Sequence, residues 1–202
     1  MSNLVFIVIY LIVSVLAIRS GELKSSSFRY FKPAPLALLI IYSLFAPFNI
    51  FLILALIFSL TGDIFLLNKE KYFTYGLLAF LIAHLFYIYL FYSLASSPNP
   101  LIGLAIVAVI DFIFFTVRKS LKKYRPVLFY MLAISFMVYF SLGFSGNAGA
   151  LIGSGGVLFF ISDGVLALNK FYKKIKFSET IILSTYYIAQ LLIVLGVKSL
   201  YT

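Results

Sequence analysis

Two carboxylates lie inside long apolar segments of this chain. Asp63 is in LTGDIFLL (residues 60–67) and Asp163 is in FFISDGVLAL (residues 159–168), although the chain has only six acidic residues in total. A carboxylate in a membrane-spanning helix costs about 2.5–3.5 kcal/mol, so such residues usually face the interior of a helix bundle and mark a site or an ion pathway. The alternative is a structural role, in which hydrogen bonds to each Asp fix helix packing.

The remaining residue types exclude several kinds of chemistry. The chain has no cysteine, which excludes disulfides and thiolate catalysis. It has no GxSxG elbow, no Gly-rich phosphate loop and no HExxH, so serine-hydrolase, nucleotide and zincin chemistry are not supported. His84 is the only histidine, and without His or Cys partners we expect no zinc site and no cofactor. His84 can instead bond structurally, line a cavity or act as a general base.

Apolar segments of membrane-spanning length recur from end to end of the chain. Hydrophobic residues make up 63% of the sequence and charged residues only 11%, whereas a soluble domain is about a quarter charged. We therefore expect an all-α polytopic membrane protein, a single integral domain over residues 1–202 with eight transmembrane helices. The expected spans are 3–18, 33–47, 49–67, 72–94, 99–117, 126–143, 148–168 and 179–199.

The basic residues predict the orientation of these spans. All of the 16 Lys and Arg residues except Lys198 lie in the loops that follow the first, third, fifth and seventh spans. The positive-inside rule places these loops in the cytoplasm and both termini on the non-cytoplasmic side of the cell membrane. The net charge of +10 therefore reflects topology, and we expect no nucleic-acid partner. The basic loops could also hold anionic lipid headgroups.

Three aspartates share one predicted depth. Asp63, Asp111 and Asp163 each come six or seven residues before the next cytoplasmic basic residue, which corresponds to about 9–10 Å along a helix. The surroundings of Asp111 offer no small or polar neighbour, so its role is open. The other acids lie in or beside basic loops, where we expect them to be solvated: Glu22, Glu70 and Glu179.

A row of small residues precedes Asp163 on its span. Gly149, Gly153 and Gly156 recur at i, i+4 and i+7, so they lie on one face of the helix. Such a face lets another helix approach closely. We expect it to bring Asp163 near a neighbouring helix.

Several segments resemble the YhhN family of membrane proteins. The two strongest are SLTGDIFLL at 59–67, followed by FTYGLLAFLIAHLFYIYLF at 73–91, and GGVLFFISDGVLALNKF at 155–171. Two weaker segments are KPAPLALLI at 32–40 and TYYIAQLL at 185–192. The segment around Asp111 matches least, so Asp111 gains no role from the resemblance.

The resemblance implies an enzyme. The family includes lysoplasmalogenases, eight-span hydrolases that cleave the vinyl ether bond of choline or ethanolamine lysoplasmalogens to a fatty aldehyde and a glycerophospho-headgroup. Its two acidic motif residues correspond to Asp63 and Asp163. Vinyl ethers are acid-sensitive, and two carboxyl groups in a low-dielectric site can divide the roles of proton donor and carboxylate. They would titrate as a coupled pair, so neither is assigned one role from sequence.

The expected substrate is a lysophospholipid that enters from the inner leaflet among the membrane lipids. Lys32, at the inner end of span 33–47, is the candidate for binding its phosphate. Asn68 and Asn169 lie near the same mouth and could bind the headgroup, or could make helix-end hydrogen bonds instead. The remaining candidates for lining the cavity are His84, Tyr87, Tyr130, Tyr187 and Gln190.

Two other functions fit the same residues. A proton-coupled transporter also uses intramembrane carboxylates at one depth. A non-catalytic lipid-binding protein would use the two aspartates for stability. A turnover assay distinguishes the enzyme from the transporter, because an enzyme releases aldehyde in detergent whereas a carrier needs a sealed membrane.

Overall fold

The computed structural model describes residues 3–45, 47–95, 98–99, 101, 103, 105, 108 and 125–201. Every regular element in this part of the chain is a helix. The elements are α1 (Asn3–Glu22), α2 (Phe28–Phe31), α3 (Ala34–Leu44), α4 (Ile50–Phe65), the 3-10 turn η1 (Leu66–Asn68), α5 (Phe73–Leu94), α7 (Arg125–Ser141), α8 (Gly146–Phe171) and α9 (Ser178–Ser199). Asp111 and most of the expected span 99–117 lie outside the described residues.

Five of the described helical segments are long and apolar enough to cross a membrane: α1, α4 continued by η1, α5, α8 and α9. Each agrees with an expected span to within four residues at either end. The helix of the second expected span, α3, has only 11 residues and rises about 16 Å, about half of the hydrocarbon core. An all-helical membrane protein is therefore confirmed, and the count of eight spans stays a prediction.

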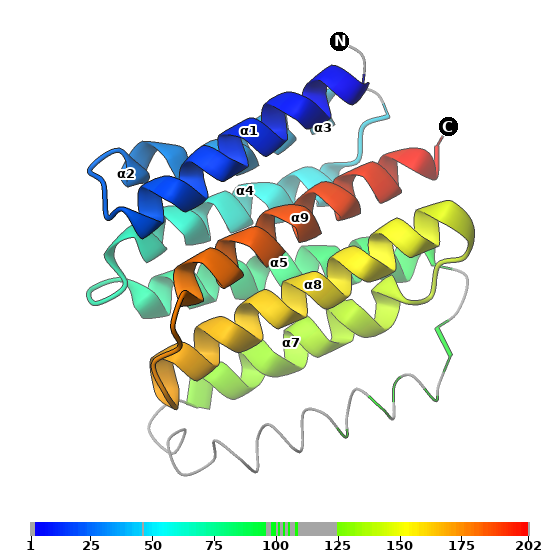
Figure 1. The fold of residues 1–202 in the computed structure, drawn as a ribbon. Coiled ribbons are helices and arrows are strands. Elements are labelled where there is room, and N and C mark those ends of the chain that lie inside the picture. Colours follow the sequence, from blue (N-terminus) through cyan, green and yellow to red (C-terminus); the bar gives the residue numbers. More distant parts are fainter. Residues whose placement is uncertain are drawn as a thin grey trace.

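The long helices lie side by side, and both termini are at the same end of the bundle (Figure 1). The α3–α4 and α7–α8 connections are at that end too, whereas the α1–α2, α4–α5 and α8–α9 connections are at the opposite end (Figure 1). The opposite end therefore carries the described basic loops, which include Lys24, Lys71 and Lys173. This arrangement agrees with the alternation of basic and uncharged loops along the sequence.

The position of α9 inside the bundle decides where the site forms. α9 contacts α1, α3 and α8. The hydroxyl of Tyr187 on α9 donates a hydrogen bond to the backbone oxygen of Lys32 at 2.9 Å, and the hydroxyl of Tyr10 on α1 donates to the backbone oxygen of Tyr187 at 2.8 Å. Both tyrosines are buried. These bonds join three segments that are far apart in sequence and hold the backbone of Lys32 against α9.

Large apolar side chains cover much of the outer surface of the bundle. Leu4, Ile12 and Val15 on α1 and Leu85 on α5 are exposed, for example. Contiguous apolar patches are rare on soluble proteins, because water penalises them. The outer surface therefore suits contact with lipid chains.

The glycine row on α8 lies against the end of α7 and the connection that follows. A Cβ on Gly149 would come within 2.5 Å of the Phe144 backbone oxygen, and a Cβ on Gly156 would overlap the side chain of Ser141. Gly155, which directly precedes Gly156, faces α9 instead. A helix, α7, approaches this face closely only at Gly156, whereas Gly149 meets the α7–α8 connection.

Candidate active site

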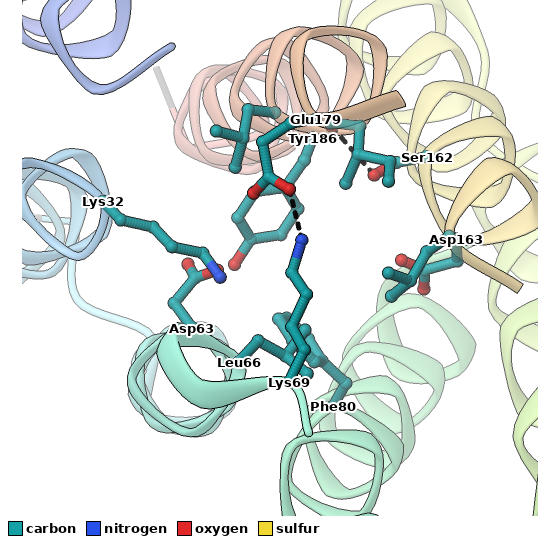
Figure 2. Close-up of a pocket in the computed structure, with 12 residues that line it drawn as sticks. Lys32, Asp63, Leu66, Lys69, Phe80, Ser162, Asp163, Glu179 and Tyr186 are labelled. Atoms are coloured by element: carbon teal, nitrogen blue, oxygen red, sulfur yellow. Dashed lines mark hydrogen bonds and ion pairs between the residues drawn. The ribbon is translucent and has the colours of Figure 1, made fainter. Parts of the chain in front are cut away.

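Asp63 and Asp163 line the same pocket, although they are 100 positions apart in the sequence. Asp63 follows Leu56 and Ser59 on the buried face of α4, at the spacing that places residues on one side of a helix. Asp163 follows Phe159 on the buried face of α8 in the same way. The pocket is lined by Lys32, Asp63, Leu66, Lys69, Phe80, Ser162, Asp163, Leu166, Glu179, Ile182, Leu183 and Tyr186 (Figure 2).

Asp63 is paired with a buried cation. Its Oδ1 lies 3.8 Å from Nζ of Lys32, and each of the two side chains is only 3% exposed. Burial lowers the pKa of the Lys32 ammonium, and the neighbouring carboxylate of Asp63 opposes that shift. An ammonium at this distance favours the ionised form of the carboxyl group.

The second oxygen of Asp63 and the hydroxyl of Tyr186 interact, but not within hydrogen-bond geometry. Among the described residues, Asp63 Oδ2 and the hydroxyl of Tyr186 have no hydrogen-bond partner, and both are buried. The Tyr186 hydroxyl points toward Asp63 in Figure 2. Buried polar atoms without partners are rare in proteins and are found where water or a ligand binds. This half of the pocket can therefore accept a hydrogen bond from water.

Asp163 has a different set of partners. The hydroxyl of Tyr130 donates a hydrogen bond to Asp163 Oδ2, and Nε2 of His84 lies 3.6 Å from the same oxygen. His84 Nδ1 lies 2.6 Å from the backbone oxygen of Phe80. Because a carbonyl oxygen only accepts, Nδ1 carries a hydrogen and the neutral ring presents the Nε2 lone pair to Asp163. At 3.6 Å the two groups make no hydrogen bond, and His84 Nε2 is itself without a partner among the described residues, so it can accept a proton from Asp163 only after the two groups approach.

None of the five candidate cavity-lining residues is among those that line the pocket: His84 and Tyr130 contact Asp163, and the other three make hydrogen bonds elsewhere. Tyr87 donates a hydrogen bond to Gln190 Oε1 at 2.5 Å, and Gln190 Nε2 donates to Ser59 Oγ at 3.1 Å. Tyr87, Gln190 and Ser59 are all buried, and their hydrogen bonds connect α5, α9 and α4. Tyr187 holds the backbone of Lys32, as described above. Tyr87, Gln190 and Tyr187 thus hold the helices that carry the pocket in position.

Neither asparagine lines the pocket. The side-chain oxygen of Asn68 accepts from the backbone N–H of Lys71 at 3.2 Å, and that of Asn169 accepts from the backbone N–H of Ile175 at 2.8 Å. These are the helix-end hydrogen bonds that the sequence left as the alternative. Asn68 is the last residue of η1 and Asn169 lies in the last turn of α8, both at the basic end of the bundle.

The sequence did not single out the ion pair at the pocket mouth. Lys69, just after η1, pairs with Glu179 in the first turn of α9. Glu179 was expected to be solvated, yet its side chain is only 29% exposed and lines the pocket. The two residues are 110 positions apart, so no local spacing connects them.

The pocket is nearly closed. It encloses about 340 Å³ with its mouth included, but the free space among its side chains admits little more than a water molecule. A larger pocket of about 1000 Å³ lies between α1, α3 and α9 at the other end of the bundle, beside Lys198, and no carboxylate lines it. No group of three or more His, Asp or Glu residues in the described part of the chain could hold a metal ion.

Comparisons with known proteins point to one family. The sequence pattern of the YhhN family matches residues 27–197. The chain is 36% identical over 142 residues to lysoplasmalogenase TMEM86B of Mus musculus, covering 70% of this chain and 61% of that protein. It is 34% identical over 154 residues to lysoplasmalogenase TMEM86A of Homo sapiens, covering 70% and 62%. The chain thus spans about three fifths of the length of these relatives. No solved structure matches it.

Proposed function

Because the chain belongs to the YhhN family, we propose that it is a membrane-embedded hydrolase that cleaves the vinyl ether bond of lysoplasmalogens. The products would be a fatty aldehyde and a glycerophospho-headgroup. Relatives at 34–36% identity carry the name lysoplasmalogenase, which supports the reaction. The observation that carries the proposal is that Asp63 and Asp163 line one buried pocket, in which Asp63 Oδ2 has no hydrogen-bond partner among the described residues.

The reaction needs one proton donor and one group that activates water. A neutral carboxyl group gives its proton to the β carbon of the vinyl ether, and the neighbouring carbon and oxygen become an oxocarbenium ion. A carboxylate stabilises this cation and takes a proton from the water that attacks it, as in the glycosidases that use two carboxyl groups. The resulting hemiacetal then breaks into the aldehyde and the alcohol of the headgroup, with no net consumption of protons.

The different partners of the two aspartates support a division of these roles. The Lys32 ammonium, 3.8 Å from Asp63, favours the ionised form of that carboxyl group, so we assign Asp63 the role of the carboxylate that orients water. Asp163 faces the His84 ring and the Tyr130 hydroxyl, and no Lys or Arg of the described chain pairs with it. We therefore assign Asp163 the role of the proton donor, with the neutral His84 ring 3.6 Å away. In this arrangement Lys32 holds Asp63 and does not reach the phosphate of the substrate.

The test is aldehyde release from a lysoplasmalogen by the purified protein in detergent. General acid or base catalysis contributes about 10²–10⁴-fold, so Asp63→Asn and Asp163→Asn should each lose at least about 100-fold in kcat. Glu70→Gln, which neutralises an exposed carboxylate on the α4–α5 connection, is the matched control and should keep full activity. Full activity in both Asp variants, with unchanged elution on size exclusion, would contradict the paired-carboxyl mechanism.

A proton-coupled lipid transporter is the alternative. The buried pairs Lys32–Asp63 and His84–Asp163 are also the kind of groups that a proton relay uses. A transporter would move lysolipid only across sealed vesicles with a proton gradient. Aldehyde release in detergent, where no gradient exists, would show that the protein hydrolyses the lipid, which a transporter does not do.

A further inference from the structure

Only two side chains of the pocket reach its surface. Of the twelve lining residues, ten are buried, and the exceptions are Lys69 and Glu179. Their side chains are 33% and 29% exposed, and they pair with each other in front of the two aspartates (Figure 2). Anything that reaches the aspartates through this mouth must pass between a cation and an anion.

We infer that Lys69 and Glu179 recognise the headgroup of the substrate, and that together they select a zwitterionic phospho-amine headgroup over a headgroup with phosphate alone. In this proposal, which rests on the hydrolase function proposed above, the Lys69 ammonium binds the phosphate and the Glu179 carboxylate binds the amine.

The charges of the pair match such a headgroup. A phosphoethanolamine group carries one anion and one cation a few bonds apart. Its phosphate can replace Glu179 as the partner of Lys69, and its amine can replace Lys69 as the partner of Glu179. Ammonium–phosphate and carboxylate–ammonium contacts are charge-assisted and stronger than neutral hydrogen bonds. An ion pair that is partly exposed to solvent contributes little to stability, so little is lost when it opens. A headgroup with phosphate alone would leave Glu179 beside a like charge.

Burial points to Lys69 for this role instead of Lys32. Lys32 is 2% exposed and its ammonium faces Asp63. Lys69 and Glu179 are close enough to Lys32 to act on its pKa, Lys69 lowering it and Glu179 raising it, so the two pairs belong to one electrostatic cluster. The inner pair serves the aspartate and the outer pair remains free to exchange partners.

The pair lies where the pocket has to open. The free space inside holds little more than a water molecule, so a lysolipid enters only when side chains at the mouth move apart. Lys69 and Glu179 come from different elements, the α4–α5 connection and the first turn of α9. Exchange of their mutual contact for contacts with the headgroup would open the mouth and place the vinyl ether deeper, beside the aspartates.

The experiment measures kcat/KM for three 1-alkenyl lysolipids that differ only in the headgroup: phosphoethanolamine, phosphate alone, and free glycerol. Glu179→Gln should lower the ratio of phosphoethanolamine to phosphate activity by about tenfold, which corresponds to about 1.4 kcal/mol. Lys69→Gln should lower both phosphate-bearing substrates about tenfold relative to the glycerol form. Glu70→Gln and Lys71→Gln, exposed neighbours outside the pocket, are the matched controls and should leave all ratios unchanged.

A purely structural ion pair predicts a different pattern. In that case each variant would lower the midpoint of thermal unfolding and reduce all three activities by one common factor, and unchanged ratios would overturn the inference. If the wild type releases no aldehyde from any of the three lipids, the proposed hydrolase function fails. Binding of uncleavable 1-alkyl lysolipids with the same headgroups then decides the inference: equal changes in Kd across the headgroups refute it, and the headgroup-dependent changes above support it.

Discussion

At the scale of single residues, the two aspartates differ by what surrounds them. Asp63 has a cation, Lys32, and an oxygen without a partner, whereas Asp163 has the hydroxyl of Tyr130 and the ring of His84. The hydrogen bond from His84 Nδ1 to the Phe80 backbone oxygen turns Nε2 toward Asp163. His84 is thus a positioning residue whose effect depends on one ring nitrogen.

Two amide substitutions of His84 separate the roles of its nitrogens. Asn places a polar atom near the position of Nδ1, and Gln places one near Nε2. If Nε2 supports Asp163, His84→Gln should keep about tenfold more kcat than His84→Asn, with KM similar in both. Single-turnover aldehyde release measures the difference. Equal rates in the two variants would assign His84 a packing role only.

At the scale of elements, the approach of α8 to α9 holds Asp163 and Glu179 around one pocket. Gly155 on α8 faces α9, where an added Cβ would come within 2.9 Å of the Ala189 backbone oxygen. A backbone atom cannot move aside as the end of a side chain can. Gly164, on the same helix beside Asp163, has nothing within 4 Å of its Cβ position.

The same substitution should therefore have opposite effects at these two glycines. Gly155→Ala should destabilise the protein by about 1–3 kcal/mol, because the helices must separate. Gly164→Ala should be neutral or stabilise by up to about 1 kcal/mol, because alanine favours a helix over glycine. Thermal unfolding of both variants in the same detergent gives the comparison. A loss of stability in Gly164→Ala as large as in Gly155→Ala would argue against steric contact as the cause.

At the scale of the whole molecule, one end of the bundle carries the charge and the site mouth. The described basic loops and the Lys69–Glu179 pair lie at that end, and both termini lie at the other (Figure 1). The positive-inside rule then predicts that the pocket opens to the cytoplasmic leaflet. A lysolipid in that leaflet would meet the mouth with its headgroup and the aspartates with its first chain carbons.

The absence of cysteine makes this orientation directly testable. Glu70→Cys and Asn147→Cys each introduce one exposed thiol, at opposite ends of the bundle. In intact cells a membrane-impermeant maleimide should label only Asn147→Cys, and after permeabilisation it should label both. Labelling of Glu70→Cys in intact cells would reverse the predicted orientation.

The sequence by itself determined the class of protein and the depth of its buried acids. Hydropathy and loop charge act locally and add along the chain, and the helical rise converts position into depth. That reasoning placed five spans to within four residues and put Asp63 and Asp163 on one level. It predicted the same level for Asp111, which lies outside the described residues.

Only the tertiary structure decided which side chains meet. The spans are apolar all round, so the sequence does not determine how each helix is rotated about its axis; packing against other helices does. The structure thus shows Lys32 facing Asp63, and the side chains of Asn68 and Asn169 accepting hydrogen bonds from backbone N–H groups at helix ends. The pair Lys69–Glu179 joins positions 110 residues apart, and no local pattern encodes such a contact. It exists because α9 packs inside the bundle and brings its first turn to the end of α4.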